Sequence, residues 1–144
     1  MNTQNYPTWL VPLDIAKELK EIDFNERCLF AFDTQNNGLY LIQREKKDCV
    51  WYEDISLLYE PVVPTDSFLI PTWEQVFEWF REKGYESYIR LESHAHFDEG
   101  NYYYFEITKS NLRQLDWQGD FDDYNEAREA LVKALIHTYK SKQL

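Results

Sequence analysis

The stretch PTWEQVFEWFREKG, residues 71–84, carries the strongest local signal in the chain. Thr72 can accept a hydrogen bond from the first turn of a helix, and Gln75 can return one to Thr72, which is the pattern of a capping box. Gly84 suits the left-handed position that follows a helix. Behind the cap, apolar side chains recur at helical spacing: Trp73, Val76, Phe77 and Phe80. The stretch therefore predicts a helix from Thr72 that ends before Gly84.

A β-hairpin is predicted directly after this helix, with strands at 87–96 and 101–108. A two-residue turn would mix apolar and polar side chains on each face. A three-residue loop over 98–100, with Gly100 in the left-handed region, keeps one face apolar and pairs Leu91 with Ile107. In that register, the face toward the helices consists of Ile89, Leu91, Tyr103, Phe105 and Ile107. The face turned away consists of Arg90, Glu92, His94, His96, Tyr102, Tyr104 and Glu106.

Two more helices and an earlier hairpin are predicted on either side of this unit. Pro12 begins a helix that ends near Asp23, and a last helix begins near Tyr124 after an acidic turn. Residues 28–32 and 39–43 flank Asn-Asn-Gly, which predicts a hairpin with the same three-residue loop.

The remaining segments are less regular. An apolar arm at 6–11 is expected to pack on the domain, and short strands are expected at 49–52 and 55–59. Residues 110–121 are interpreted as a connection in which Trp117 turns inward.

The predicted fold class is α+β, in the order α-β-β-α-β-β-α. The chain has 144 residues, which fits one domain, so we expect residues 1–144 to form a single domain. The two hairpins are expected to join in one antiparallel sheet of at least four strands, with the helices packed on one of its faces.

The composition restricts the kinds of partner. Aromatic residues make up 17% of the chain, which argues for a packed core rather than disorder. The formal net charge is −11, so phosphate backbones and anionic membranes should repel the chain. We therefore expect no direct nucleic-acid binding and no membrane binding, and instead a protein partner or a second copy of the chain in a homodimer.

The cysteines and the apolar runs indicate a cytoplasmic protein. Cys28 and Cys49 are too few for a disulfide framework, and neither lies in a zinc-binding spacing. Cys28 begins an apolar run and should behave as a small buried hydrophobic residue. The first residues lack the pattern of a signal peptide, and no apolar run reaches the roughly 18–20 residues of a membrane span.

A metal site is one hypothesis for the outward hairpin face. His94 and His96 lie two residues apart on one strand and therefore point the same way. The predicted register places Glu92 opposite Glu106, and two facing carboxylates need a compensating charge. Arg90 on the same face is the simpler compensator, and a transition metal held by Glu92, His94 and Glu106 is the alternative.

A binding surface is the second hypothesis for the same face, made by Tyr88, His94, His96, Tyr102 and Tyr104. An exposed aromatic patch of this kind is typical of an interaction site. The alternative is that another segment covers it, such as the arm at 6–11 or part of 49–59.

Nothing else in the sequence indicates catalysis. The chain has no GxSxG motif, and with 4 glycines no phosphate-binding loop can be written. Acidic residues are so frequent that no pair stands out as a general acid and base. Whether the chain is an enzyme therefore stays open, with a non-enzymatic role favoured; no cofactor is expected, and the catalytic residues stay unknown.

Three segments resemble a group of uncharacterised small acidic proteins of gut bacteria and their phages: VPLDIAKELKE at 11–21, PTWEQVFEWFREK at 71–83 and YYYFEI at 102–107. The similarity covers most of the chain. It implies an accessory role of phage or mobile-element type, and it implies no activity and transfers no catalytic residue.

Two functions follow from these observations. The first is a cytoplasmic, non-enzymatic protein-interaction domain; one version is a DNA mimic whose acidic residues at 51–80 and 116–129 imitate phosphates. The second is a metal-assisted hydrolase with its site at Glu92, His94, His96 and Glu106.

Overall fold

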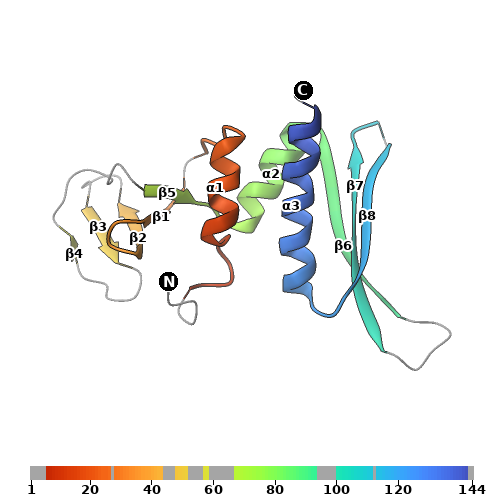
Figure 1. The fold of residues 1–144 in the computed structure, drawn as a ribbon, viewed down its shortest axis with the longest axis horizontal. Coiled ribbons are helices and arrows are strands. Elements are labelled where there is room, and N and C mark those ends of the chain that lie inside the picture. The colour runs from red at the N-terminus through yellow and green to blue at the C-terminus, as the bar shows by residue number, and fades with distance from the viewer. Residues whose placement is uncertain are drawn as a thin grey trace. The chain divides into compact units, whose positions relative to one another are not determined.

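The structure is a computed structural model. It describes residues 6–26, 28–43, 48–51, 57–58, 67–93, 100–111 and 113–142. The chain divides into two compact units, Met1–Gln75 and Val76–Leu144, and each has its own β-sheet (Figure 1). This division concerns compactness, and the single domain over residues 1–144 stays a prediction. Among the described residues, no helix has both the length and the apolar character needed to span a membrane.

In the first unit, helix α1 (Leu13–Glu21) lies where the sequence predicts it. Pro12 is its N-cap, and the buried stripe consists of Ile15, Ala16 and Leu19. Asp23 has a φ of 64°, a left-handed conformation that a helix cannot continue through. The helix therefore ends at the predicted place because the backbone reverses there.

The sheet of the first unit has five antiparallel strands in the order β4-β3-β2-β1-β5. The strands β1 and β2 confirm the first predicted hairpin, and β3 and β4 match the two short strands that were expected. The fifth strand, β5, pairs with β1 and packs against α1, and the sequence did not reveal it. The bounds are β1 (Phe30–Asp33), β2 (Gly38–Gln43), β3 (Asp48–Trp51), β4 (Leu57–Leu58) and β5 (Ser67–Ile70).

The turn between β1 and β2 differs from the prediction. Asp33 pairs with Gly38, so the loop has four residues instead of three, and Asn37 rather than Gly38 has a positive φ, of 52°. The buried carboxylate of Asp33 accepts hydrogen bonds from the backbone N–H of Gln35 at 2.9 Å and from the side chain of Asn36 at 2.6 Å. The carboxylate thus organises a turn that the Asn-Gly pattern suggested glycine would form.

The arm at 6–11 packs on its own unit, as expected. The Val11 N–H bonds the carbonyl of Pro71, and the indole N–H of Trp73 bonds the carbonyl of Thr8 at 2.8 Å. Helix α2 (Trp73–Glu82) begins at these contacts. Its capping box is confirmed: the Gln75 N–H donates to the Thr72 hydroxyl at 3.2 Å, and the Thr72 N–H donates to the Gln75 side chain at 2.8 Å.

In the second unit, the end of α2 leads through Gly84, whose φ is 93°, into a three-stranded antiparallel sheet. Helix α3 contacts all three strands and lies along one face of the sheet (Figure 1). Phe105 and Ile107 are fully buried on that face, as predicted. The bounds are β6 (Tyr85–Ser93), β7 (Asn101–Lys109), β8 (Gln114–Phe121) and α3 (Tyr124–Lys142).

The predicted register of the β6–β7 hairpin is wrong by four residues. Leu91 pairs with Tyr103 rather than with Ile107, and Ser93 pairs with Asn101. An even shift returns every side chain to the same face, so the predicted faces hold although the pairs differ. Gly100 has the predicted positive φ, 85°, and residues 94–99 of the predicted strand and loop lie outside the described residues.

The class α+β is confirmed, whereas the predicted single sheet is replaced by two. The first hairpin pairs with β5, and the second hairpin pairs with β8, the segment interpreted as a connection. β5 and β8 thus come from segments without clear alternation, whereas β3 and β4 extend the first sheet on the side of β2. The element order matches the prediction in part: β5 and β8 are new, and β3 and β4, although expected as short strands, were not counted in the predicted order.

Candidate binding surface on the second sheet

The face of the β6–β7–β8 sheet that points away from α3 is the candidate site, and we call it the outer face. Alternation along the paired strands determines its members. No described element of the second unit lies over it, and in Figure 1 α3 lies on the opposite side of these strands. The outer face carries Glu86, Tyr88, Arg90 and Glu92 of β6, Tyr102, Tyr104, Glu106 and Thr108 of β7, and Gln114, Trp117 and Gly119 of β8.

Three rings run across the outer face as an aromatic row of Tyr102, Tyr104 and Trp117. The Tyr102 and Tyr104 ring centres lie 6.3 Å apart with their planes at 41°, and those of Tyr104 and Trp117 lie 5.6 Å apart at 32°. Tyr88 meets Tyr104 edge to face at 6.3 Å. Tyr104 at the centre is buried by these neighbours, whereas Tyr88 is 40% exposed and Trp117 is 49% exposed.

Gly119 determines how Trp117 lies on the sheet. A Cβ atom at position 119 would stand 2.7 Å from Cη2 of the indole and 3.3 Å from two further atoms of its six-membered ring. The indole therefore rests directly on the backbone of Gly119. Any side chain at this position would have to displace the ring.

Polar groups surround the row and bind one another. The Tyr88 hydroxyl donates a hydrogen bond to the carboxylate of Glu106, its cross-strand partner. That hydrogen bond, with a smaller contribution from desolvation, raises the pKa of Tyr88 to about 12. The Arg90 guanidinium lies 5.3 Å from the centre of the Tyr88 ring. Among the described residues, the outer face thus combines aromatic rings with one cation, Arg90, and with the carboxylates of Glu86, Glu92 and Glu106.

The structure brings together three of the five residues predicted for the binding surface: Tyr88, Tyr102 and Tyr104. The other two, His94 and His96, lie outside the described residues. The alternative that part of 49–59 covers the face involves 52–56 and 59, which also lie outside the described residues.

Trp117 is the residue that sequence reasoning missed. It was expected to turn inward within a connection, and it stands exposed on β8. Trp117 and Phe121 are four residues apart on β8, so regular alternation would place them on the same face. Phe121 nevertheless stacks on Phe105 on the inner face. The irregular pairing of β8 and the positive φ of Asp120, 66°, reverse the alternation between these two residues. The sequence did contain one clue to this arrangement: Trp117 precedes Gly119 by two residues, so on a strand the two share a face and the ring can lie over the glycine.

The carboxylates proposed as metal ligands do not face each other. Glu106 pairs with Tyr88 and Glu92 pairs with Tyr102. Four residues along a strand separate the two positions by about 13 Å. The predicted pairing of Glu92 with Glu106 is therefore wrong. At this separation the two carboxylates cannot hold the same metal ion. Within the described ranges, no three His, Cys, Asp or Glu side chains gather into a metal-binding group.

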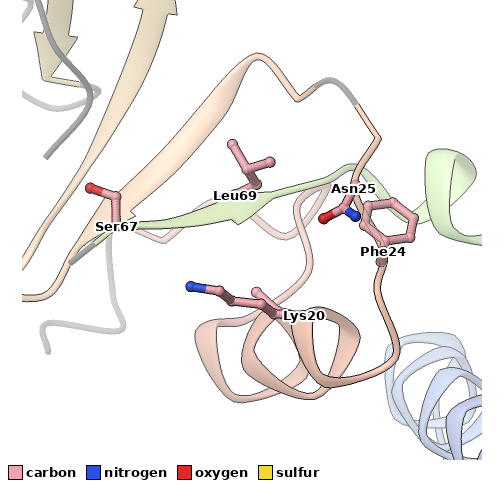
Figure 2. A pocket seen from close by; sticks show the side chains of 6 residues that line it. Lys20, Phe24, Asn25, Ser67 and Leu69 are labelled. Carbon is pink, nitrogen blue, oxygen red and sulfur yellow. The ribbon is translucent and has the colours of Figure 1, made fainter. Parts of the chain in front are cut away.

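A recess in the first unit is a further candidate site (Figure 2). The Lys20 ammonium lies 4.8 Å from the centre of the Phe68 ring, and the Tyr40 hydroxyl donates a hydrogen bond to the Ser67 hydroxyl at 3.0 Å. Its volume is about 200 Å³, below the roughly 300–1,000 Å³ of typical ligand pockets. We assign it no function. The lining residues are Ala16, Lys20, Phe24, Asn25, Ser67 and Leu69.

Cys28 is buried, as predicted. Burial, together with the nearby Glu26, raises the pKa of its thiol to about 12. The thiolate that a nucleophilic cysteine needs is therefore disfavoured at neutral pH.

Comparisons with models of protein families, with curated proteins and with solved structures find no match for this chain. The resemblance to small acidic proteins of gut bacteria and phages therefore stays a prediction.

Proposed function

We propose that this chain is a non-enzymatic protein-interaction domain that binds its partner through the outer face. The observation that carries the proposal is the aromatic row, flanked by Tyr88 and ending in a half-exposed Trp117, on a sheet face that no described element of the second unit covers. Exposed aromatic side chains gathered on one face are a common mark of an interaction site.

The residue types support binding. Tyrosine, tryptophan and arginine are the residues that most often dominate interface energetics, commonly by about 2 kcal/mol or more each on truncation to alanine. Tyr104 is already packed by its neighbours, so the row is held in place before a partner arrives. A preorganised surface loses less entropy on binding than a mobile one.

Binding fits this face better than catalysis does. Its central polar groups contact each other: Tyr88 donates a hydrogen bond to Glu106, and Arg90 lies over the Tyr88 ring.

The cytoplasmic setting and the accessory role of phage or mobile-element type are retained as part of the proposal. The DNA-mimic version needs the acidic residues of 51–80 and 116–129 on one side of the molecule, and 52–56 and 59–66 of the first segment lie outside the described residues.

Capture from an extract of the source cells tests the proposal. The wild-type chain should retain a discrete partner, and Trp117→Ala should lose most of it. Tyr124→Ala is the matched control, because Tyr124 is 44% exposed, close to the 49% of Trp117, but belongs to α3. Equal capture by wild type and Trp117→Ala, or equal loss in both variants, would overturn the proposal. A partner must also be shown to bind the purified chain directly.

A further inference from the structure

We infer that the outer face takes a basic segment of its partner, with arginine or lysine side chains seated over Trp117 and the rest of the aromatic row. This inference rests on the proposed interaction function and names the chemistry of the partner. Its three supports are the orientation of the indole, a cation already bound in the same manner, and the charge of the surface.

The indole of Trp117 presents a ring face to the partner. The six-membered ring of the indole rests on Gly119, and 49% of the residue is exposed, so the side of the ring away from Gly119 is where a partner's cation would sit. Its neighbour Tyr104 is tilted by 32° and is not set edge to face against it. The face of an aromatic ring carries partial negative charge, and tryptophan attracts cations most strongly.

The outer face already holds one cation on a ring. The Arg90 guanidinium lies 5.3 Å from the centre of the Tyr88 ring, within the distance at which the attraction operates. The same arrangement, with an arginine or lysine supplied by a partner, can form on Trp117, which lies across β7 from Tyr88 on the same face.

The charge of the surface selects a basic partner over the other occupants. Among the outer-face residues that the structure describes, Arg90 is the one basic residue, against the carboxylates of Glu86, Glu92 and Glu106. The whole chain carries a net charge of −11. A second copy would bring the same charge and be repelled, whereas a basic segment would be attracted and could pair with these carboxylates.

Titration with three synthetic peptides of equal length tests the inference. One alternates arginine with serine, one alternates glutamine with serine, and one alternates tyrosine with serine. The arginine peptide should bind the full chain, and the other two should bind at least about fivefold more weakly, which corresponds to about 1 kcal/mol for a cation on an indole. Chemical shifts of the indole N–H of Trp117 report binding at the site itself.

Variants separate a specific site from general attraction to an acidic protein. Trp117→Ala should weaken binding of the arginine peptide about fivefold or more, and Glu106→Gln should weaken it about threefold. Gly119→Ala keeps every functional side chain but displaces the indole, so it should weaken binding in the same direction. Glu82→Gln removes an equal charge from the exposed end of α2 and should change binding less than twofold. Backbone amide spectra confirm that each variant is folded.

Each of the following results would overturn the inference. Equal weakening by Glu82→Gln and Glu106→Gln, or no effect of Trp117→Ala, would show attraction by net charge alone. Binding of the glutamine or tyrosine peptide as tightly, with the same dependence on Trp117, would keep the interaction function and remove the basic partner. Self-association that Trp117→Ala abolishes, measured by sedimentation, would identify a second copy as the occupant. Failure of all three peptides refutes the basic partner, and the capture experiment then decides the interaction function separately.

Discussion

The second unit contains two aromatic groups with different geometry, one beside α3 and one on the outer face. The inner cluster consists of Trp79, Phe80, Tyr85 and Tyr139, and its ring pairs lie at plane angles from 59° to 89° with centres 5.0 to 6.3 Å apart. In the aromatic row, the plane angles are 41° and 32°. Most pairs of the inner cluster thus meet edge to face, whereas the two pairs of the aromatic row are tilted at smaller angles. Tyr88, beside the row, meets Tyr104 at 78°, which resembles the inner pairs.

Under the proposed function, this difference separates stability from recognition among the same residue types. Edge-to-face packing matches the positive edge of one ring with the negative face of the next, so the inner cluster satisfies itself. Two ammonium groups complete it: Lys83 lies 5.0 Å from the Trp79 ring, and Lys109 lies 3.9 Å from the Tyr85 ring. On the outer face, Trp117 keeps half of its surface exposed. The inner cluster therefore stabilises the unit, and the row is available to a partner.

The largest effect is expected from truncation in the inner cluster. Phe80 is fully buried, so Phe80→Ala should lower the free energy of unfolding by about 3–5 kcal/mol. Trp117→Ala removes a larger ring, yet it should cost only about 1 kcal/mol because half of that ring already contacts water. Urea unfolding of both variants measures the two values. Equal losses of stability would remove the distinction between the clusters.

A smaller effect should separate the two cation contacts. Lys109→Met keeps the aliphatic stem over the buried Tyr85 but removes the charge, and it should lower the free energy of unfolding by about 1 kcal/mol. Arg90→Met makes the same change over the exposed Tyr88 and should cost less than about 0.5 kcal/mol. Urea unfolding at low salt is the measurement. A larger loss for Arg90→Met would mean that the outer contact stabilises the fold.

The smallest effect concerns the pH dependence of the outer face. The pKa of Tyr88 is raised from 10.0 to about 12, chiefly by its hydrogen bond to Glu106. Because the folded value lies above the unfolded one, the stability from this hydrogen bond is fully present below about pH 10 and is lost as the pH rises through 12. Tyrosine ring carbons followed by NMR should show this titration, with the signal identified by its loss in Tyr88→Phe. In Glu106→Gln the pKa should fall back toward 10, and an unchanged value would refute the assigned cause.

Local physics made the helices predictable from the sequence. The capping box of Thr72 and Gln75, the glycine at 84 and the apolar stripe of α2 act within a few residues of one another, and the structure contains all of them. The faces of the β6–β7 hairpin were predicted for the same reason, because side chains alternate along each strand whatever the partner. Three members of the binding surface followed from that alternation: Tyr88, Tyr102 and Tyr104.

Pairing between distant segments was not predictable in the same way. The register of β6 and β7 differed by four residues because an even shift leaves the faces unchanged. The bulge of β8 hid its strand pattern, and with it the exposure of Trp117. β5 pairs with β1 from more than thirty positions away, which is why the sequence indicated one sheet where two exist.

Site-specific photo-cross-linking tests the central claim, that the outer face is the binding surface, most directly. A photoreactive phenylalanine analogue at position 117 should cross-link to the captured partner, and the same group at position 124, on α3, should not. The cross-linked partner peptide should contain arginine or lysine next to the bond. Cross-linking from position 124 with none from position 117 would contradict the claim.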